Sequence, residues 1–207
     1  MTCLPKSFYT RATPVVAKEL IGHTLVRVIE KDGGNVRLSG TIVETEAYGY
    51  REDDASHAFR GQTSRNSVMF GEVGCAYVYL SYGVHYCLNI SARSLHSEAG
   101  AVLFRSVYPL EGVNVMKGIS KKQDLRNLSR GPGKLTKAMN ITSTENGKDM
   151  TNESSDLRIE EGIRPSKIAS TARIGISRGI NRAWRFVDVS SPYLSRPVSH
   201  ARRPRLK

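Results

Sequence analysis

The stretch YVYLSYGVHYCLNI, residues 77–90, holds two runs of alternating side chains on either side of one glycine. From residue 77 to residue 82 the pattern repeats every second position, which is typical of a β-strand. Gly83 can adopt the positive φ that tight hairpin turns require. The stretch therefore predicts a β-hairpin with Tyr82 at its exposed tip.

Four of the nine tyrosines of the chain lie in this predicted hairpin. Tyr77 and Tyr86 are explained most simply as aromatic residues that pack across strands and stabilise the sheet. Tyr79 is expected to point from the sheet toward one face. Packing explains Tyr82 poorly, because an exposed ring at a tip gains little from it. The spacing alone does not say what the exposed ring contacts.

The segments around the hairpin predict a mixed domain with a substantial antiparallel sheet. The Asp32-Gly33-Gly34 turn joins the first two predicted strands. Strands are expected at 23–31, 35–48, 100–108, 171–177 and 184–189, and helices from Thr13 to Gly22 and from Pro109 onward. Thr13 is expected to be the N-cap of the first helix. The chain shows no internal repeat, so one domain is predicted over 1–196, with a basic tail at 197–207.

The composition indicates a polyanionic partner. The 207 residues contain 31 Lys and Arg against 19 Asp and Glu, which gives a formal net charge of +12. Such a balance favours nucleic acid or an anionic membrane surface. The alternative is a generally basic proteome or a solubility bias.

The cysteines and the apolar pattern exclude several classes of protein. Cys3, Cys75 and Cys87 are odd in number and lack CxxC spacing, which argues against a disulfide framework or a structural zinc site. No apolar run is long enough to cross a membrane, and the N-terminal sequence lacks the apolar core of a signal peptide. An intracellular location is expected, in the cytoplasm of a prokaryote or the nucleus of a eukaryote.

The segment VETEAY, residues 43–48, is the strongest candidate for catalysis that the residues alone provide. Side chains alternate faces along a strand, so Glu44, Glu46 and Tyr48 are expected to share one face. Two carboxylates and a phenol in line would be costly to bury without a function. The alternative is a polar strand surface that faces solvent. The spacing does not say which glutamate would be active.

Two other motifs are weaker. GPGKLTKA, at 131–138, lacks the first glycine and the Ser or Thr of a P-loop, so a nucleotide site is not expected. A single phosphate held near Lys134 and an ordinary basic helix start both remain open. His57 lies in the long segment 49–72, which is often a functional kind of segment. The remaining histidines show no ligand spacing, so neither a metal nor a cofactor is predicted.

Taken together, these motifs closely resemble the alkyladenine (3-methyladenine) DNA glycosylases. The resemblance extends from about Lys6 to Arg196 and lies in the order and spacing of its motifs. These are VETEAY, an acidic segment that ends at His57, QTSRNSVMF, YVYLSYGVHYCLNIS, AVLFR, GPGKL and TARIGIS. The resemblance implies an α+β fold: a single mixed domain with a curved, mainly antiparallel sheet, surrounding helices and a protruding β-hairpin.

The resemblance also implies roles in catalysis. Glu46 would be the general base that activates water against C1′ of the target nucleotide. Arg105 and the backbone carbonyl of Ile174 would help to hold that water. With no lysine next to Glu46 to form a Schiff base, the enzyme is expected to be monofunctional and to leave the strand uncut.

Further roles implied by the resemblance concern the DNA. Tyr82 would be a wedge that fills the hole left in the duplex, and Asn89 would disfavour normal guanine. The walls of the base pocket would be Tyr48, His57 and Tyr79, and the contacts to the DNA backbone would come from Thr63, Arg65 and Lys134. The expected partner is double-stranded DNA that contains damaged purines, bound by a monomer.

Two further hypotheses belong to other functional classes. The first is a non-catalytic DNA-binding module that uses the same wedge to recognise distorted duplex. The second is an RNA-binding or formyltransferase-like auxiliary domain, since related folds can host other tasks. The chain also departs from the family pattern through a longer connection at 91–100, whose role the sequence does not indicate.

Overall fold

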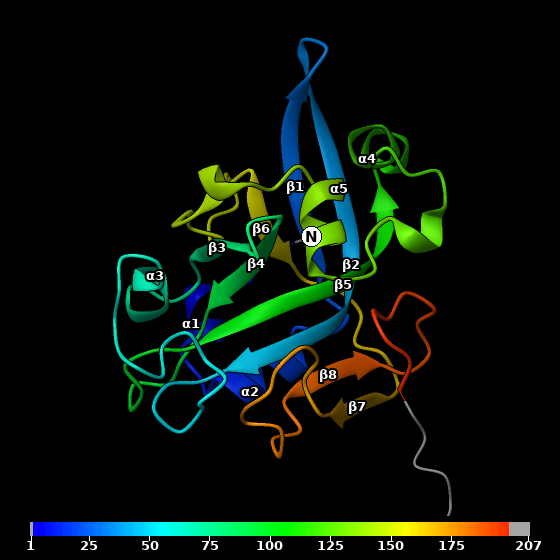
Figure 1. Cartoon of the computed structure of the whole chain (residues 1–207). Coiled ribbons are helices and arrows are strands. Elements are labelled where there is room, and N and C mark those ends of the chain that lie inside the picture. Colours follow the sequence, from blue (N-terminus) through cyan, green and yellow to red (C-terminus); the bar gives the residue numbers. More distant parts are fainter. Residues whose placement is uncertain (1, 199–207) are drawn as a thin grey trace, which may run out of the picture.

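The protein is built around an antiparallel sheet, seen here in a computed structural model that describes residues 2–198 (Figure 1). The strands within the described residues are β1 (Thr24–Lys31), β2 (Gly34–Tyr48), β3 (Ala76–Ser81), β4 (His85–Ser91), β5 (Ala101–Glu111), β6 (Leu157–Glu160), β7 (Ile168–Thr171) and β8 (Arg185–Asp188). They are arranged in the order β3-β4-β5-β2-β1-β6, while β8 pairs with both β2 and β7. The predicted α+β class with a mainly antiparallel sheet is confirmed.

Short helices surround this sheet. They are α1 (Lys6–Tyr9), α2 (Thr13–Glu19), α3 (Ser67–Phe70), α4 (Val113–Ser120) and α5 (Pro132–Ala138), with 3₁₀ turns at Leu125–Asn127 and Ser143–Glu145. Among residues 2–198, no helix combines the length and apolar character that a membrane crossing needs.

Strand β2 is the longest strand and positions the site. Its residues 34–41 pair with β1, residues 39–48 pair with β5, and residues 44–46 pair with β8. The register with β5 shifts three times between residues 39 and 45. The extra residue lies in β2 at Val43 and in β5 at Leu110 and Arg105. Such bulges bend strands and increase their twist, and β2 separates from β1 and then pairs with β8. Its last part is consequently enclosed by strands on both edges.

Helix α2 supplies part of the hydrophobic core against β2. Val16, Ala17 and Leu20 are fully buried in the main cluster. The predicted N-cap role of Thr13 is wrong, because Ala12 occupies the cap position and Thr13 is already helical. The Thr13 hydroxyl instead donates to the Ala92 carbonyl at 2.8 Å, which ties the helix to the end of β4.

The predicted hairpin at 77–90 is confirmed as β3 and β4, with Tyr82 at its tip. Tyr82 and Gly83 have φ values of 50° and 70°, the left-handed pair that a type I′ turn requires. The Val84 N–H donates to the Ser81 carbonyl at 3.1 Å and closes the turn. The Tyr82 side chain is 93% exposed, so the tip presents this ring to solvent.

The helix expected from Pro109 is wrong at its start. Pro109 lies in β5 opposite Gly40, next to a register shift where a missing N–H is tolerated. The strand continues to Glu111, and Gly112, with φ of 68°, turns the chain into α4 at Val113.

The strand expected at 171–177 is also placed wrongly. Strand β7 covers residues 168–171 and ends where that prediction begins. Beyond Thr171 the chain makes contacts with β2 and the 49–72 segment in place of a ladder. The strand expected at 184–189 is confirmed as β8.

The C-terminal prediction is described only in part. Residues 193–198 belong to the described chain, and Tyr193 and Leu194 pack with Val43 and Val187 in a small cluster. Residues 199–207 of the predicted tail lie outside the described residues. The boundary between domain and tail at 196 stays a prediction.

Substitution of Gly33 tests whether the turn between β1 and β2 requires a residue with positive φ, and Gly118 in α4 provides the control. Gly33 has φ of 79°, and an added Cβ would meet nothing within 4 Å. Gly33→Ala should therefore lower the free energy of unfolding by about 1–2 kcal/mol through backbone strain alone. Gly118, in α4, has equally open surroundings without positive φ, so Gly118→Ala should raise it by about 0.5–1 kcal/mol. Urea denaturation measures both, and equal effects of the two substitutions would contradict this account.

Candidate active site

A cavity of about 450 Å³ lies beside the β3–β4 hairpin, within the size range of ligand sites. It brings together most of the residues singled out in the sequence. Those that line it are Tyr48, His57, Arg65, Tyr79, Tyr82, Asn89, Arg105 and Ile174. Glu46, Thr63 and Lys134 are not part of its lining.

One wall of the cavity is aromatic. The ring centroids of His57 and Tyr79 are 4.6 Å apart, and those of Tyr77 and Tyr79 are 5.3 Å apart. The His57 Nδ1 atom lies 2.9 Å from the Tyr77 hydroxyl. Tyr77 was expected only to pack in the sheet, and that expectation is incomplete because it also lines the cavity. The signal was present, since alternation places Tyr77 on the same strand face as Tyr79.

The aromatic wall carries no net charge near neutral pH. Desolvation raises the pKa of Tyr77 to about 12 and raises the pKa of Tyr79 well above its ordinary value. Desolvation lowers the pKa of His57, and the positive charge of Arg65 lowers it further. Neutral rings in tilted and edge-to-face arrangements suit a flat aromatic ligand.

Asn89 lies at the base of the hairpin and is nearly buried, with 4% of its surface exposed. Its Nδ2 atom donates to the Tyr77 carbonyl at 3.0 Å across the β3–β4 pair. This hydrogen bond holds the amide in one orientation at the cavity wall.

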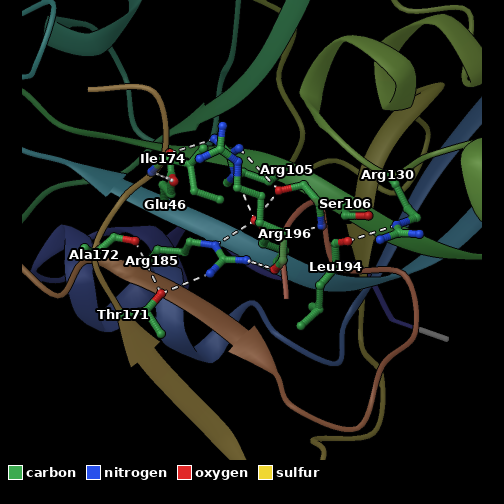
Figure 2. A network of polar contacts seen from close by, with 12 residues as sticks. Glu46, Arg105, Ser106, Arg130, Thr171, Ala172, Ile174, Arg185, Leu194 and Arg196 are labelled. Carbon is green, nitrogen blue, oxygen red and sulfur yellow. Dashed lines mark hydrogen bonds and ion pairs between the residues drawn. The ribbon is translucent and has the colours of Figure 1, made fainter. Parts of the chain in front are cut away.

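Glu46 is fully buried directly behind the cavity lining. Its carboxylate accepts hydrogen bonds from the Ile174 N–H at 2.7 Å, the Tyr48 hydroxyl at 2.9 Å and Arg105 Nη1 at 3.0 Å. All three donors line the cavity, and Figure 2 shows Glu46 between Ile174 and Arg105. The Ile174 contact runs through its N–H, while the role expected for its carbonyl stays a prediction.

Burial raises the pKa of Glu46 above its ordinary value. The charge of Arg105 and the hydrogen bonds from Ile174 and Tyr48 act in the opposite direction, but desolvation is the larger effect. A carboxylate with a raised pKa is a stronger base than a solvent-exposed glutamate, and such groups are common at catalytic sites.

Glu44 has a different environment on the same strand face. It accepts hydrogen bonds from Arg105 Nε at 2.9 Å and Arg185 Nε at 2.8 Å, and from the Ser195 N–H and hydroxyl at 2.5 and 2.6 Å. Desolvation acts to raise its pKa, yet Arg185, Arg105 and Ser195 outweigh it, and the pKa of Glu44 is lowered.

The surroundings of Glu44 and Glu46 differ in a way that the spacing did not predict, and the difference indicates which of them could act as a base. Both are 0% exposed, so the alternative of a solvent-facing polar strand is wrong. Glu44 is enclosed by two guanidinium groups, whereas the Glu46 carboxylate accepts hydrogen bonds only from residues that line the cavity. Their surroundings make Glu46 the candidate base and Glu44, whose pKa is lowered, an ion-pair partner of Arg105.

A second ion pair that the sequence did not single out supports the site. Arg173 donates to both oxygens of Asp53 at 2.6 Å, and both side chains are 0% exposed. Arg173 also donates to the Ala47 carbonyl at 2.8 Å, and its guanidinium lies 4.6 Å from the Tyr48 ring centroid. The pair therefore fixes the chain next to Ile174 and packs against Tyr48.

The residues expected to contact the DNA backbone lie outside or at the mouth of the cavity. Arg65 is exposed, with its guanidinium 5.2 Å from the Tyr79 ring centroid. Thr63 is exposed, and its N–H donates to Asn66 Oδ1 at 2.6 Å. Lys134 is exposed on α5, with Nζ 3.4 Å from Asn127 Oδ1, and both alternatives for its role stay open.

Residues 2–198 contain no cluster of three or more His, Cys, Asp or Glu side chains with the arrangement of a metal site.

Comparison with known proteins gives the family. The family model described as methylpurine-DNA glycosylase (MPG) matches residues 7–192. The chain belongs to this family. It is accordingly a DNA glycosylase, a hydrolase of N-glycosyl bonds that serves base excision repair, and the resemblance inferred from the motifs is confirmed.

Two relatives are similar to this chain over nearly their whole length. A protein of Methanocella arvoryzae is 43% identical over 200 residues, which cover 95% of this chain and 97% of the relative. A protein of Prosthecochloris aestuarii is 44% identical over 193 residues, covering 92% and 90%. Both relatives carry the name 3-methyladenine DNA glycosylase as a provisional assignment.

Replacing Asp53 should destabilise the protein strongly, because Arg173 would be left buried without a counter-charge. Asp53→Asn is expected to cost about 3–5 kcal/mol in the free energy of unfolding. The matched control is Asp156→Asn, which breaks ion pairs of a half-exposed carboxylate with Arg27 and Lys148 and should cost about 1 kcal/mol or less. Chemical denaturation of both variants tests this, and a small effect at Asp53 would show that the pair is not structural.

Proposed function

We propose that this DNA glycosylase extrudes damaged purines from duplex DNA and hydrolyses their N-glycosidic bonds with a water activated by Glu46. The expected substrates are 3-methyladenine, 7-methylguanine, hypoxanthine and ethenoadenine. The observation that carries the proposal is the placement of Glu46, whose carboxylate is buried behind the cavity and bound only by residues that line it.

Extrusion of the base is supported by the hairpin and the aromatic wall. An enzyme that acts on a base in a duplex must take it out of the stack, which costs a few kcal/mol. Tyr82, 93% exposed at the hairpin tip, can enter the space that the base leaves. Stacking against Tyr79 and His57 contributes on the order of 1–3 kcal/mol per base, which offsets part of the cost.

The hydrolytic step uses Glu46 as a general base. The carboxylate takes a proton from water while the water oxygen forms a bond to C1′, and the electron pair of the breaking N-glycosidic bond leaves with the purine. A cationic alkylated purine leaves readily. Neutral hypoxanthine or ethenoadenine needs protonation or a hydrogen bond on its ring.

A monofunctional reaction is supported by the composition of the cavity. No lysine occurs among the described residues that line it, so they offer no amine for a Schiff base with C1′. The product would be an abasic site in an uncut strand. We expect Asn89, whose amide donates to the Tyr77 carbonyl, to disfavour guanine through a clash with its exocyclic amino group.

Glu46→Gln separates this enzyme from a non-catalytic module that only recognises distorted duplex. The substitution should lower single-turnover excision of 7-methylguanine from a duplex by about 100-fold or more, because a general base contributes about 10²–10⁴-fold. Binding to the same duplex should persist. An excision rate equal to that of the wild type would refute the assignment of Glu46.

The same variant should be more stable than the wild type at neutral pH. Because the folded protein raises the pKa of Glu46, the stability that this group contributes at low pH is lost as pH rises through the folded pKa. Glutamine removes that loss, and the melting temperature should rise by about 2–4 °C per kcal/mol gained. The difference should shrink toward pH 4. Thermal melts at both pH values test the sign.

Tyr82→Ala tests the wedge. The variant should bind lesion-containing duplex about tenfold or more weakly, since it loses the ring that fills the gap in the stack. Its binding to undamaged DNA should keep the same salt dependence, because that term comes from phosphate contacts. Leu95→Ala is a matched control at another side chain, 91% exposed. Unchanged lesion binding by Tyr82→Ala would remove the wedge role.

An excision assay with all four lesions, followed by alkali to reveal abasic sites, would rank the substrates. Structured RNA as competitor addresses the RNA-binding hypothesis, which requires RNA to bind better than lesion-containing duplex. The monomeric state stays a prediction that analytical ultracentrifugation can measure.

A further inference from the structure

We propose that Glu44 and Arg185 are positioning residues that set the pH at which Glu46 becomes an active base, by controlling how Arg105 divides its charge between two carboxylates. This inference rests on the proposed role of Glu46. It concerns two side chains that make no hydrogen bond to Glu46 and act on it mainly through Arg105.

Arg105 forms hydrogen bonds with two carboxylates. Its Nε donates to Glu44 at 2.9 Å and its Nη1 donates to Glu46 at 3.0 Å. Both carboxylates are 0% exposed and the arginine side chain is 8% exposed. One guanidinium cannot neutralise two buried carboxylates, so a second positive charge is needed for both to stay ionised.

Arg185 supplies that charge from β8. Its Nε donates to the same Glu44 oxygen at 2.8 Å, and its side chain is 4% exposed. Two further hydrogen bonds fix it, to the Arg196 carbonyl at 2.6 Å and the Thr171 hydroxyl at 3.1 Å. Figure 2 shows Arg185 held by Thr171 and Arg196 beside Arg105. With Glu44 neutralised from this side, the Arg105 charge remains available to Glu46.

The other groups that face Glu46 do not supply a variable charge. Tyr48 on β2 and Cys87 on β4 stay neutral, because desolvation raises the pKa of each. Arg173 is positively charged, but it is engaged by both oxygens of Asp53. The balance around Glu46 therefore depends on Arg105, and through it on Glu44 and Arg185.

Removing either positioning charge should move the acid limb of the activity profile, but in opposite directions. Arg185→Gln leaves Arg105 to compensate Glu44 alone, so ionised Glu46 becomes more costly and the limb should move to higher pH. Glu44→Gln frees Arg105 for Glu46 and removes a like charge, so the limb should move to lower pH. Each shift should be about one pH unit, typical of a charge within a few ångströms.

Opposite signs distinguish this mechanism from general damage to the fold. Loss of stability or packing would affect both variants in the same way. In the double variant Glu44→Gln/Arg185→Gln the charge balance is restored, so the limb should return toward its wild-type position. Arg185→Lys keeps the charge and should leave the limb close to wild type.

The experiment is a pH profile of single-turnover excision from a duplex with one 7-methylguanine. This cationic leaving group needs no acid, so the low-pH limb reports the base. Arg158→Gln is the control, since it breaks a comparable arginine–glutamate pair at Glu160, with bonds of 3.0 and 2.7 Å, and should not move the limb. Shifts of equal sign, or none, in the two single variants would overturn the inference.

A titration of the Glu46 carboxyl by ¹³C NMR separates failure of the inference from failure of the proposed function. The signal is assigned by its loss in Glu46→Gln, and its pKa should shift oppositely in the two variants whether or not the protein excises bases. If Glu46→Gln excises at the wild-type rate, the proposed function fails, and the NMR shifts still decide the inference. If neither Glu44→Gln nor Arg185→Gln changes the pKa of the Glu46 carboxyl, the positioning role of Glu44 and Arg185 is excluded.

Discussion

The burial of two carboxylates side by side on β2 is the constraint on which the rest of the site depends. Taking ionised groups out of water costs several kcal/mol each, and the cost is offset only when every oxygen receives good hydrogen bonds. Glu44 and Glu46 receive theirs from β5, β8, the 172–177 segment and the C-terminal segment. Elements distant in the chain are therefore held together by the need to satisfy these two groups.

The register shifts between β2 and β5 make this arrangement possible. A regular strand would keep one neighbour along each edge, and β1 would occupy the edge that β8 takes. Register shifts between residues 39 and 45 bend β2, so that β1 pairs with its first half and β8 with residues 44–46. Arg105 from β5 and Arg185 from β8 then reach the same carboxylate from opposite sides.

In the proposed function, the site separates chemistry from recognition. The proposed base, Glu46, is buried on β2, while Tyr77, Tyr79 and the exposed ring of Tyr82 belong to the β3–β4 hairpin. Asn89 stands at the junction, paired with Tyr77 on one side and with Leu103 of β5 on the other. Such a division would suit the proposed extrusion of the base, in which one part distorts the duplex while the other keeps its geometry.

Local rules determined the features that depend on a few neighbouring residues. Alternation and one glycine predicted the hairpin and its exposed Tyr82, and alternation put Glu44 and Glu46 on one face. The order of the motifs indicated the family and a role for Glu46. Only the tertiary structure decided how the two glutamates differ, because the partners that distinguish them are remote in sequence.

Arg185 is 141 residues from Glu44, and Arg173 is 120 residues from Asp53. No spacing pattern predicts such ion pairs. From the sequence, an isolated arginine is expected at the surface, and only the fold shows that it is buried. Likewise the start of α4 depended on a bulge at Leu110, next to Pro109 in β5, which hydrophobic periodicity does not encode. The sequence by itself thus determined which side chains share a strand face. The tertiary structure decided which of them lie in water and which lie beside an opposite charge, since desolvation and ion pairing depend on neighbours that only folding brings together.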